Sequence, residues 1–331
     1  MSFGVNTNIM LDTYQRLTSC NGIFLDLESF GEKGKVKVNV NPNSPYFLLQ
    51  NNEKYFLLDE NGTEIVDSVS RQGSQIKSNI FAPQLEGVVA IGLFNCAIPK
   101  EEKCKFCAAG EYDGLKYSED IFTQELERIQ KVENIKAITV NAGSLITKPD
   151  RGYALMSPFI RILKNAKINE INLELMPPDM NSNELETLLG TAKEDGVTSM
   201  QFNLEVWDPK KRKEIMPYKG QISRNVYLNT ISKASNIFGP GKISSVLMAG
   251  IDSDKELREG AFEVMDAGGI PSIEPFRPLP NTPLEKSNPN INYRNIIQLT
   301  GEIISKLQTM YGVDIKKQFE GCLKCSGCNI Y

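Results

Sequence analysis

Apolar runs of strand length alternate with amphipathic segments of helix length from about residue 85 to residue 312, and this alternation constrains the fold more than any other feature. The runs expected to form strands are 87–93, 135–141, 170–175, 198–204, 242–248 and 270–276. The segments expected to form helices are 118–132, 151–166, 182–195, 222–237, 254–267 and 292–311. Six successive strand–helix units predict an α/β protein whose parallel sheet is either open or curled into a partial barrel. Ligands of such sheets bind at the C-terminal ends of the strands.

The start of the third helix can be placed from its polar residues. Ser and Asn side chains accept hydrogen bonds from the first free N–H groups of a helix. Asn183 is followed three residues later by Glu186, which is the spacing of a capping box. This helix is therefore expected to begin at Ser182 or Asn183.

The chain on either side of the repeat has a different character. Residues 1–84 are expected to form a small β-rich region, because 35–40 alternate apolar and polar residues as a strand does. Asn61-Gly62 stands between two apolar runs and predicts a hairpin turn. The sequence thus divides into an N-terminal region (1–84), the strand–helix repeat (85–312) and a short tail (313–331).

Composition and charge exclude several classes of protein. The net charge of −4 over 331 residues gives no support for a nucleic-acid or anionic-membrane partner. No apolar stretch of about 18 residues exists to span a membrane, and the first residues lack the pattern of a signal peptide. We therefore expect a cytoplasmic protein. The absence of histidine excludes His-based triads and imidazole ligands for zinc.

The cysteines of the chain are clustered. Cys96, Cys104 and Cys107 form a C-x7-C-x2-C motif directly after the first strand of the repeat. A second set in the tail has the spacing C-x2-C-x2-C and consists of Cys322, Cys325 and Cys328, while Cys20 stands alone. In a reducing compartment such clusters favour metal binding over disulfides.

The first cysteine set suits an iron–sulfur cluster better than zinc. Three thiolates can bind three irons of a four-iron cluster and leave the fourth iron open to an exogenous ligand. A tetrahedral zinc site would need a fourth protein ligand, which no histidine or nearby cysteine supplies. A zinc site, a structural cluster or reduced, unligated thiols are the alternatives.

On these residues the chain resembles the radical S-adenosylmethionine (SAM) superfamily. Its usual motif is C-x3-C-x2-C after the first strand of a six-unit barrel, with an aromatic residue before the last cysteine, and Phe106 holds that position here. The first gap differs, since seven residues separate Cys96 from Cys104. The resemblance implies a partial (β/α)6 TIM-like barrel and a [4Fe-4S] cluster that binds SAM. It also implies reductive cleavage of SAM to a 5′-deoxyadenosyl radical.

The resemblance also implies which residues contact SAM. Ala142 and Gly143 follow the second strand and would let backbone carbonyls approach the SAM amino group, although a simple strand-to-helix turn is an equal alternative. Asn203 and Glu205 match the Asn-apolar-acid pattern of biotin and lipoyl synthases, where the pair binds the ribose hydroxyls. A capping or surface pair is the alternative. The nearest resemblance is thus to the biotin and lipoyl synthase branch.

Two further SAM contacts follow from the same branch. Arg224 opens the fourth helix, where an arginine pairs with the SAM carboxylate, and a solvated helix arginine is the alternative. Met248 ends the fifth strand and would pack against adenine, with ordinary core packing as the alternative. Glu174, Glu274 and Arg277 are candidate substrate contacts at the barrel mouth, or else a buried ion-pair group.

The tail cysteines predict an auxiliary cluster. Cys322, Cys325 and Cys328 could hold a second iron–sulfur cluster whose fourth ligand comes from Cys20, Ser326, substrate or sulfide. A zinc site or a reactive thiol tail is the alternative.

The predicted function is that of an anaerobic radical SAM enzyme that abstracts hydrogen from a small-molecule or peptidyl substrate. A flavodoxin- or ferredoxin-type protein would supply the electron. Sulfur insertion (a sulfurtransferase reaction) is one hypothesis, and dehydrogenation, epimerisation or rearrangement are alternatives. A non-catalytic iron–sulfur or zinc-binding module is the alternative of another class.

Overall fold

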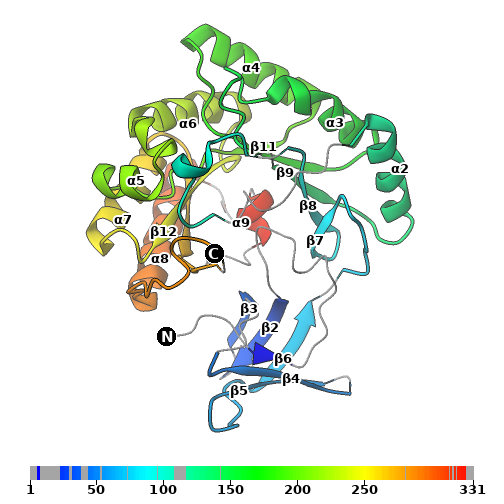
Figure 1. Cartoon of the computed structure of the whole chain (residues 1–331), viewed down its shortest axis with the longest axis vertical. Helices are drawn as coiled ribbons and strands as arrows, with labels where there is room; N and C mark the ends of the chain where they lie inside the picture. The colour runs from blue at the N-terminus through cyan, green and yellow to red at the C-terminus, as the bar shows by residue number, and fades with distance from the viewer. Residues whose placement is uncertain are drawn as a thin grey trace.

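The main element of the protein is one long sheet that curls around a central axis (Figure 1). The computed structural model describes residues 6–7, 23–29, 32–38, 44–52, 54–72, 74–94, 96–107, 117–141, 143–279, 281–312, 314, 317 and 319–325. Seven strands build the sheet in the order β13-β12-β11-β10-β9-β8-β7. They are β7 (Ala82–Leu85), β8 (Val88–Gly92), β9 (Ala137–Asn141), β10 (Glu170–Glu174), β11 (Ser199–Gln201), β12 (Ile243–Ala249) and β13 (Ile270–Pro275).

Strands β8 to β13 run parallel to one another, as the strand–helix alternation predicts. Helices follow the strands and surround the outside of the curled sheet (Figure 1). They are α2 (Glu119–Gln130), α3 (Tyr153–Asn165), α4 (Ser182–Asp195), α6 (Arg224–Phe238), α7 (Asp254–Asp266) and α8 (Tyr293–Tyr311). The prediction of a partial TIM-like (β/α)6 barrel is confirmed. One large hydrophobic core lies between the sheet and these helices.

Helix α4 spans the predicted residues 182–195, but its cap differs from the expected one, and strand β11 is shorter than predicted. Helix α4 is capped by Asn181, one residue before Ser182, because the Asn181 side chain accepts from the N–H of Glu184 and the Glu184 side chain accepts from the N–H of Asn181. Strand β11 ends at Gln201, short of the predicted 204, because its register on β12 shifts there: Gln201 pairs with Ser244, but the next bridge joins Glu205 to Leu247. One extra residue is thus accommodated before Glu205, and such a bulge interrupts the regular ladder.

Three elements of the barrel were not predicted. Strand β7 precedes β8 in an antiparallel hairpin and forms one edge of the sheet. Helix α5 (Pro209–Ile215) and the 3-10 turn η2 (Lys219–Gln221) stand between β11 and α6. Asp208 caps α5 and Pro209 occupies its first turn. An Asp followed by Pro is a typical signal for the start of a helix, so the beginning of α5 is marked in the sequence.

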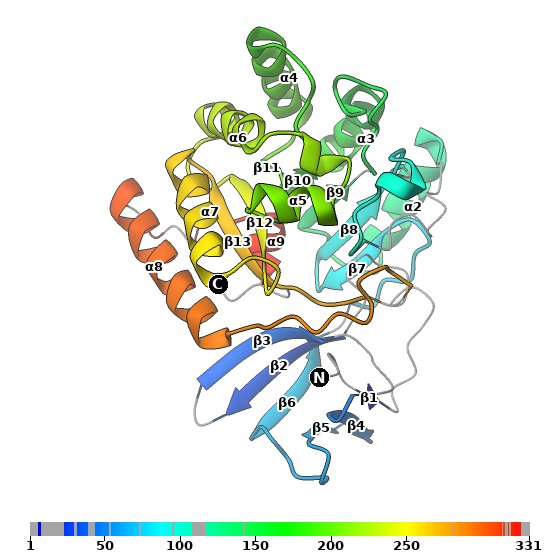
Figure 2. The same cartoon turned by 60° about the vertical axis from the view of Figure 1, so that its left-hand side comes forward.

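The N-terminal region contains two small sheets below the barrel (Figures 1 and 2). One has the order β3-β2-β6 and the other β1-β4-β5. Their bounds are β1 (Asn6–Thr7), β2 (Ile23–Ser29), β3 (Glu32–Val38), β4 (Phe47–Asn51), β5 (Lys54–Leu58) and β6 (Ser68–Gln72). Leu25, Leu48 and Leu57 form a small core of their own there. The β-rich character of this region is thereby confirmed.

The hairpin predicted at Asn61-Gly62 is only partly formed. The chain turns there, since the Asp59 carboxylate accepts from the N–H groups of Asn61 and Thr63. After the turn only one bridge joins the two arms, between Leu58 and Glu64. The chain then continues into β6, which pairs with β2 instead. The second apolar run thus serves a different sheet from the one that the local pattern suggested.

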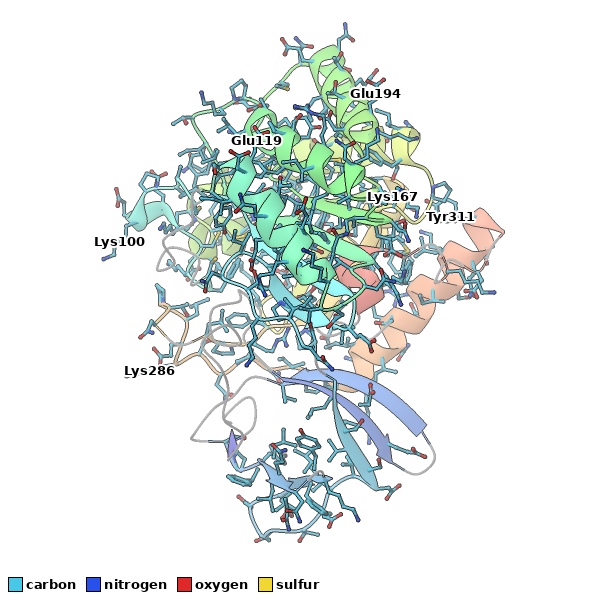
Figure 3. The ribbon with its side chains drawn as sticks, turned by 90° about the vertical axis from the view of Figure 1, so that its right-hand side faces the viewer. Lys100, Glu119, Lys167, Glu194, Lys286 and Tyr311 are labelled. Atoms are coloured by element: carbon cyan, nitrogen blue, oxygen red, sulfur yellow. The ribbon has the colours of Figure 1, made fainter. Side chains whose placement is uncertain are left out.

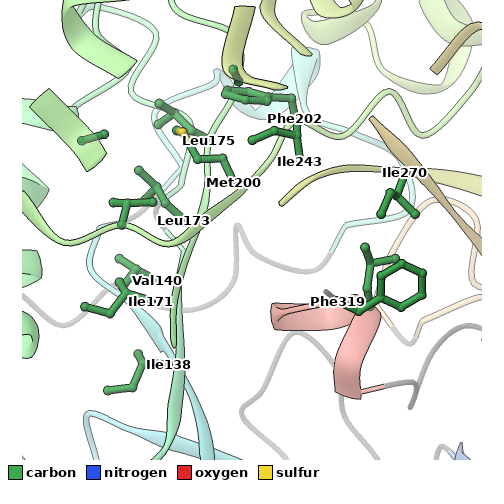
Figure 4. Packing of buried hydrophobic residues seen from close by; sticks show 14 of the residues in the cluster. Ile138, Val140, Ile171, Leu173, Leu175, Met200, Phe202, Ile243, Ile270 and Phe319 are labelled. Atoms are coloured by element: carbon green, nitrogen blue, oxygen red, sulfur yellow. The ribbon is translucent and has the colours of Figure 1, made fainter. Parts of the chain in front are cut away.

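The tail folds back onto the N-terminal end of the barrel through helix α9 (Gly321–Cys325). Glu320 binds Thr198 and Lys242, and Lys324 binds Glu170, all of which stand at or before the starts of barrel strands. Phe319 and Leu323 are buried in the main core (Figure 4). Figure 1 shows α9 at the centre of the ring of strands.

The entry of the tail into the barrel needs a glycine. Gly321 has φ +57°, and a Cβ on it would lie 2.5 Å from Cγ of Asn172 on β10. A residue other than glycine would therefore be strained and would also collide with the barrel. The two ends of the barrel are seen from the side in Figure 3, where Lys100 lies toward the C-terminal ends of the strands and Lys167 and Tyr311 toward the opposite end.

Among the described residues, no helix combines the length and the apolar character needed to cross a membrane.

A matched pair of glycines tests the packing of the helices. A Cβ added to Gly301 on α8 meets no atom within 4 Å, whereas one added to Gly269 would lie 2.7 Å from Cγ2 of Ile231. We expect Gly301→Ala to stabilise the protein by about 0.5–1 kcal/mol, since alanine restricts the unfolded chain. Gly269→Ala should lower the melting temperature. Thermal unfolding of both variants checks the pair, and a destabilised Gly301→Ala would contradict the expectation.

Candidate functional site

The first cysteine set lies beyond the C-terminal end of β8, in the loop that leads to α2. Cys96 is the fourth residue after β8, and the 3-10 turn η1 (Lys100–Glu102) separates it from Cys104. The N–H of Glu102 donates to the carbonyl of Pro99 at 2.9 Å, and the N–H of Cys107 donates to the carbonyl of Cys104 at 3.1 Å. The long gap of the C-x7-C motif is thus taken up by a compact turn.

Backbone hydrogen bonds fasten this cysteine loop to four other parts of the barrel mouth. One is the loop after β9, where the carbonyl of Ser144 accepts from the N–H of Ala97 at 3.0 Å. The N–H of Lys105 donates to Ile215 at the end of α5, and the N–H of Tyr218 donates to Glu102. The N–H of Leu284, after β13, donates to Lys105. Because the acceptors and donors are main-chain groups, the position of the loop depends on the fold of these neighbours more than on their side chains.

A small apolar cluster packs under the loop. Phe106 and Cys104 are half-buried against Met248 and Val246 of β12 and Phe276 after β13. This cluster is separate from the main core and lies on the inner side of the mouth. Phe106 comes from the cysteine loop, and Met248 is the residue expected to pack against adenine. The fold brings the two together in this cluster.

The three thiols influence one another electrostatically. Burial raises the pKa of Cys104 to about 12, Lys219 opposes this, and the charges of Glu205, Cys107 and Cys96 raise the pKa further. A negative charge at Cys104 is therefore costly without a cation. A bound metal ion relieves such a cost, since metals bind the deprotonated thiolate.

The donor set fits a thiolate-bound iron–sulfur cluster. Cys96, Cys104 and Cys107 are free of disulfides and range from half-buried to exposed. Within the part of the chain that is described, no three Cys, Asp or Glu side chains converge closely enough to hold a metal ion. The fit consequently rests on the chemistry and placement of the three thiols.

Asn203 and Glu205 both lie at the edge of β12, where β11 has ended. Oδ1 of Asn203 accepts from the N–H of Val246 at 3.1 Å. The N–H of Glu205 donates to the carbonyl of Val246 at 2.7 Å, and its carbonyl accepts from Met248 at 2.8 Å. The two residues therefore satisfy the backbone groups of β12 beyond the point where β11 ends. Asn203 does so with its side chain, which agrees in part with the capping role given above as the alternative.

A buried lysine, not anticipated from the sequence, completes this group. Nζ of Lys219 lies 3.0 Å from Oε2 of Glu205, and the two side chains are 13% and 14% exposed. Burial alone lowers the pKa of Lys219, but the charges of Glu205, Tyr227 and Cys104 outweigh it and raise the pKa above its usual range. Lys219 is thus a fixed positive charge, and no local sequence pattern marks it.

A fully buried arginine supports this lysine. Arg212 is 1% exposed and donates to the carbonyls of Leu204, Val206 and Lys219. Its guanidinium also lies 4.6 Å from the centre of the Tyr227 ring. Arg212 therefore joins α5, η2, α6 and the segment after β11 into one unit.

Arg224 lies at the first turn of α6, as expected, and is held by an aromatic neighbour. Its guanidinium stacks 4.0 Å from the centre of the Trp207 ring, and Nη1 donates to the Trp207 carbonyl at 3.1 Å. Cation–π stacking of this kind fixes the plane of the guanidinium. The contact orients Arg224 and uses one of its donors.

The remaining candidates lie at other strand ends. Gly143 follows β9 and its N–H donates to the carbonyl of Phe94, while Ala142 lies outside the described residues. Glu174 accepts from Nδ2 of Asn141 at 2.5 Å. Glu274 is paired in register with Met248. Arg277, two residues beyond the end of β13, follows the same strand. These side chains therefore belong to the C-terminal end of the barrel.

The second cysteine set is not part of this mouth. Cys322 and Cys325 belong to α9, which packs against β9 and β10 at the N-terminal end of the barrel. Their side chains, and Cys20, Ser326 and Cys328 as a whole, lie outside the described residues. The barrel consequently separates the two cysteine sets along its axis.

A surface cleft of about 740 Å³ lies near the N-termini of α7 and α8. Lys211, Asp252, Asn292 and Arg294 are among its lining residues. It contains none of the candidate site residues, so the cleft is distinct from the barrel mouth.

Comparison with known proteins identifies the fold of the chain. No known protein family and no curated protein matches it in sequence. The fold is similar to that of HydG, a maturase of the [FeFe]-hydrogenase, with 14% identity and a TM-score of 0.50 over 67% of this chain and 49% of HydG. HydG from Carboxydothermus hydrogenoformans gives 16% identity and a TM-score of 0.51 over 73% of this chain and 57% of that one.

Methylornithine synthase (PylB) is also similar, with 16% identity and a TM-score of 0.47 over 68% of this chain and 62% of PylB. At these identities the two HydG structures establish a shared fold alone. The chain spans about half the length of the HydG proteins that it matches.

Proposed function

We propose that this chain is a radical SAM enzyme. The observation that carries the proposal is the three-thiol loop at the C-terminal mouth of a partial (β/α)6 barrel, beside Glu205, Met248 and Phe106. Ligands of such barrels bind at that end. The fold is shared with HydG, a maturase of the [FeFe]-hydrogenase, and this likeness is compatible with a catalytic role for the barrel.

In this proposal each residue of the mouth has a part in binding. Cys96, Cys104 and Cys107 hold a [4Fe-4S] cluster, whose open iron would bind SAM and supply the electron that cleaves it to a 5′-deoxyadenosyl radical. Glu205 and the amide nitrogen of Asn203 face the ribose, while Met248 and Phe106 pack against adenine. Arg224, oriented by Trp207, pairs with the SAM carboxylate, and the backbone at Ala142 and Gly143 receives the amino group.

The substrate is expected beside SAM, within reach of the radical. Glu174, Glu274 and Arg277 would orient a small-molecule or peptidyl substrate so that one C–H bond points at the radical carbon. A flavodoxin- or ferredoxin-type protein would deliver the electron. The apolar cluster of Val246, Met248 and Phe276 would keep water from the reacting atoms.

We further propose that the tail holds an auxiliary cluster and that the reaction is a sulfur insertion. The support for the auxiliary cluster is the docking of α9, the helix that carries Cys322 and Cys325, through Glu320 and Lys324. Sulfur insertion is the reaction for which such a cluster would supply the sulfur. Dehydrogenation, epimerisation or rearrangement by the same radical are the alternative reactions, and a non-catalytic metal-binding module is the alternative of another class.

Anaerobic reconstitution with iron and sulfide tests the proposal. We expect about four irons and four sulfides for each cluster, and 5′-deoxyadenosine after reduction in the presence of SAM. The variant with Cys322→Ala, Cys325→Ala and Cys328→Ala should lose the auxiliary iron and keep SAM cleavage. Full retention of iron in this variant would contradict the proposal of an auxiliary cluster. Zinc binding without SAM cleavage would contradict the proposed radical SAM function. Product mass separates sulfur gain from loss of two hydrogens or no change.

A further inference from the structure

We propose that Lys219 is a positioning residue that couples the two halves of the site, since it orients the Glu205 carboxylate and is also the buried cation beside the cysteine loop. The inference rests on the proposed function and assigns a role that the radical SAM resemblance does not supply. It concerns how the cluster and the nucleoside are held in a fixed relation to each other.

The Lys219–Glu205 pair is too costly to be explained by stability alone. Its atoms are 3.0 Å apart and both side chains are largely buried. Removing two charges from water costs several kcal/mol per ion, and buried pairs can often be replaced by apolar residues without loss of stability. A role in holding the carboxylate direction accounts better for the presence of the pair at the mouth.

The backbone of Glu205 is held as firmly as its side chain. A φ of 65° is uncommon for a residue with a side chain and concentrates at functional sites. Hydrogen bonds to Val246 and Met248 fix this conformation on one side, and Lys219 fixes Oε2 on the other. Within the described part of the chain Oε1 accepts no hydrogen bond, so this oxygen is left to face a ribose hydroxyl.

Lys219 itself is clamped between the loop and the barrel. The Lys219 carbonyl accepts from Arg212 at 3.3 Å, and the preceding Tyr218 N–H donates to Glu102 of the cysteine loop at 3.1 Å. The next residue must be glycine, because a Cβ on Gly220 would lie 2.5 Å from the Arg212 carbonyl oxygen. The ammonium group thus extends from an anchored backbone to Glu205, and its charge acts on Cys104 of the loop.

The ammonium group of Lys219 is expected to affect both the reduction potential of the loop cluster and the orientation of the Glu205 carboxylate. Reduction adds negative charge to an iron–sulfur cluster, so a nearby ammonium makes reduction easier and the Glu205 carboxylate makes it harder. Loss of the ammonium should shift the midpoint potential of the loop cluster to a more negative value. It should also release the Glu205 side chain and weaken SAM binding.

The experiment uses Lys219→Met in the full, reconstituted chain. We expect unchanged loop iron, a midpoint potential shifted to a more negative value in an EPR-monitored titration, and SAM binding weakened about 10-fold or more. Lys219→Arg should restore the potential. The matched control is Lys233→Met, which breaks the Lys233–Glu186 pair (20% and 53% exposed) between the outer helices α6 and α4. It should leave both quantities unchanged.

Glu205→Gln decides the question even where Lys219→Met does not fold. It removes the negative charge and keeps the volume, so the potential should move in the opposite direction, to a more positive value, while SAM binding weakens. Wild-type potential and SAM affinity in these variants would overturn the role of Lys219. A wild-type chain that loads no cluster or binds no SAM would instead remove the proposed function, and this inference with it.

Discussion

Cys104→Ala should abolish the loop cluster and all SAM cleavage while the protein remains folded. Alanine preserves the apolar contacts that the half-buried Cys104 makes with Val246 and Met248. The hydrogen bonds of the loop are made by main-chain groups, which the substitution does not change. A four-iron cluster held by two thiolates instead of three lacks a ligand and is lost.

The measurement is iron and sulfide per chain after anaerobic reconstitution, together with 5′-deoxyadenosine formed from SAM. We expect the iron content to fall by about four atoms per chain, with the melting temperature of the apo-protein near that of the wild type. The control is the variant with Cys322→Ala, Cys325→Ala and Cys328→Ala, which should keep the iron of the loop cluster. An unchanged iron content in Cys104→Ala would show that the loop is not the cluster site.

Arg212→Met should destabilise the protein more than any other substitution of a charged residue at the mouth. The guanidinium is 1% exposed and serves the carbonyls of Leu204, Val206 and Lys219. Methionine fills a similar volume but cannot donate. The carbonyls of Leu204 and Lys219 keep the N–H groups of Val206 and Ile222 as donors, whereas the buried Val206 carbonyl loses its hydrogen bond to Arg212. Since a buried unsatisfied group costs about 1–3 kcal/mol, and the stacking of Arg212 on the Tyr227 ring is lost as well, we expect a loss of about 2 kcal/mol or more.

Thermal unfolding of the apo-protein measures this effect, which corresponds to a fall in melting temperature of roughly 3 °C or more for a chain of this length. The matched control is Arg258→Met. Arg258 also stacks on an aromatic ring, Phe262, and pairs with Glu302, but its side chain is 49% exposed. An exposed pair contributes about 1 kcal/mol or less. Equal losses in the two variants would contradict the assigned role of Arg212.

Much of the barrel could be predicted because its elements are defined by local patterns. Strand-length apolar runs and amphipathic periods located β8, β10 and β13 to within a residue or two. The predicted bounds of α4, 182–195, were right, but its N-cap was not anticipated, because several polar residues precede that helix and only the fold selects Asn181 as the cap. Strand β11 was predicted too long, because an apolar run carries no sign of the register shift between Gln201 and Glu205.

The candidate site could be predicted only in part. The cysteine loop follows β8 directly, so its place at the barrel mouth followed from the order of the elements. The contribution of Lys219 could not be predicted, because a sequence does not distinguish a buried lysine from an exposed one. The place of the tail was likewise hidden, since Glu320 meets Lys242 across 78 residues of chain.

The sequence by itself thus determined the strand–helix order, the parallel barrel and the end of the barrel at which Cys96, Cys104 and Cys107 lie. These properties depend on side-chain periodicity and on the order of elements, both of which are written along the chain. The tertiary structure alone decided that Lys219 joins Glu205 to the cysteine loop and that α9 closes the opposite end. Buried ion pairs and docked segments depend on which distant parts of the chain meet after folding, and no local pattern encodes that.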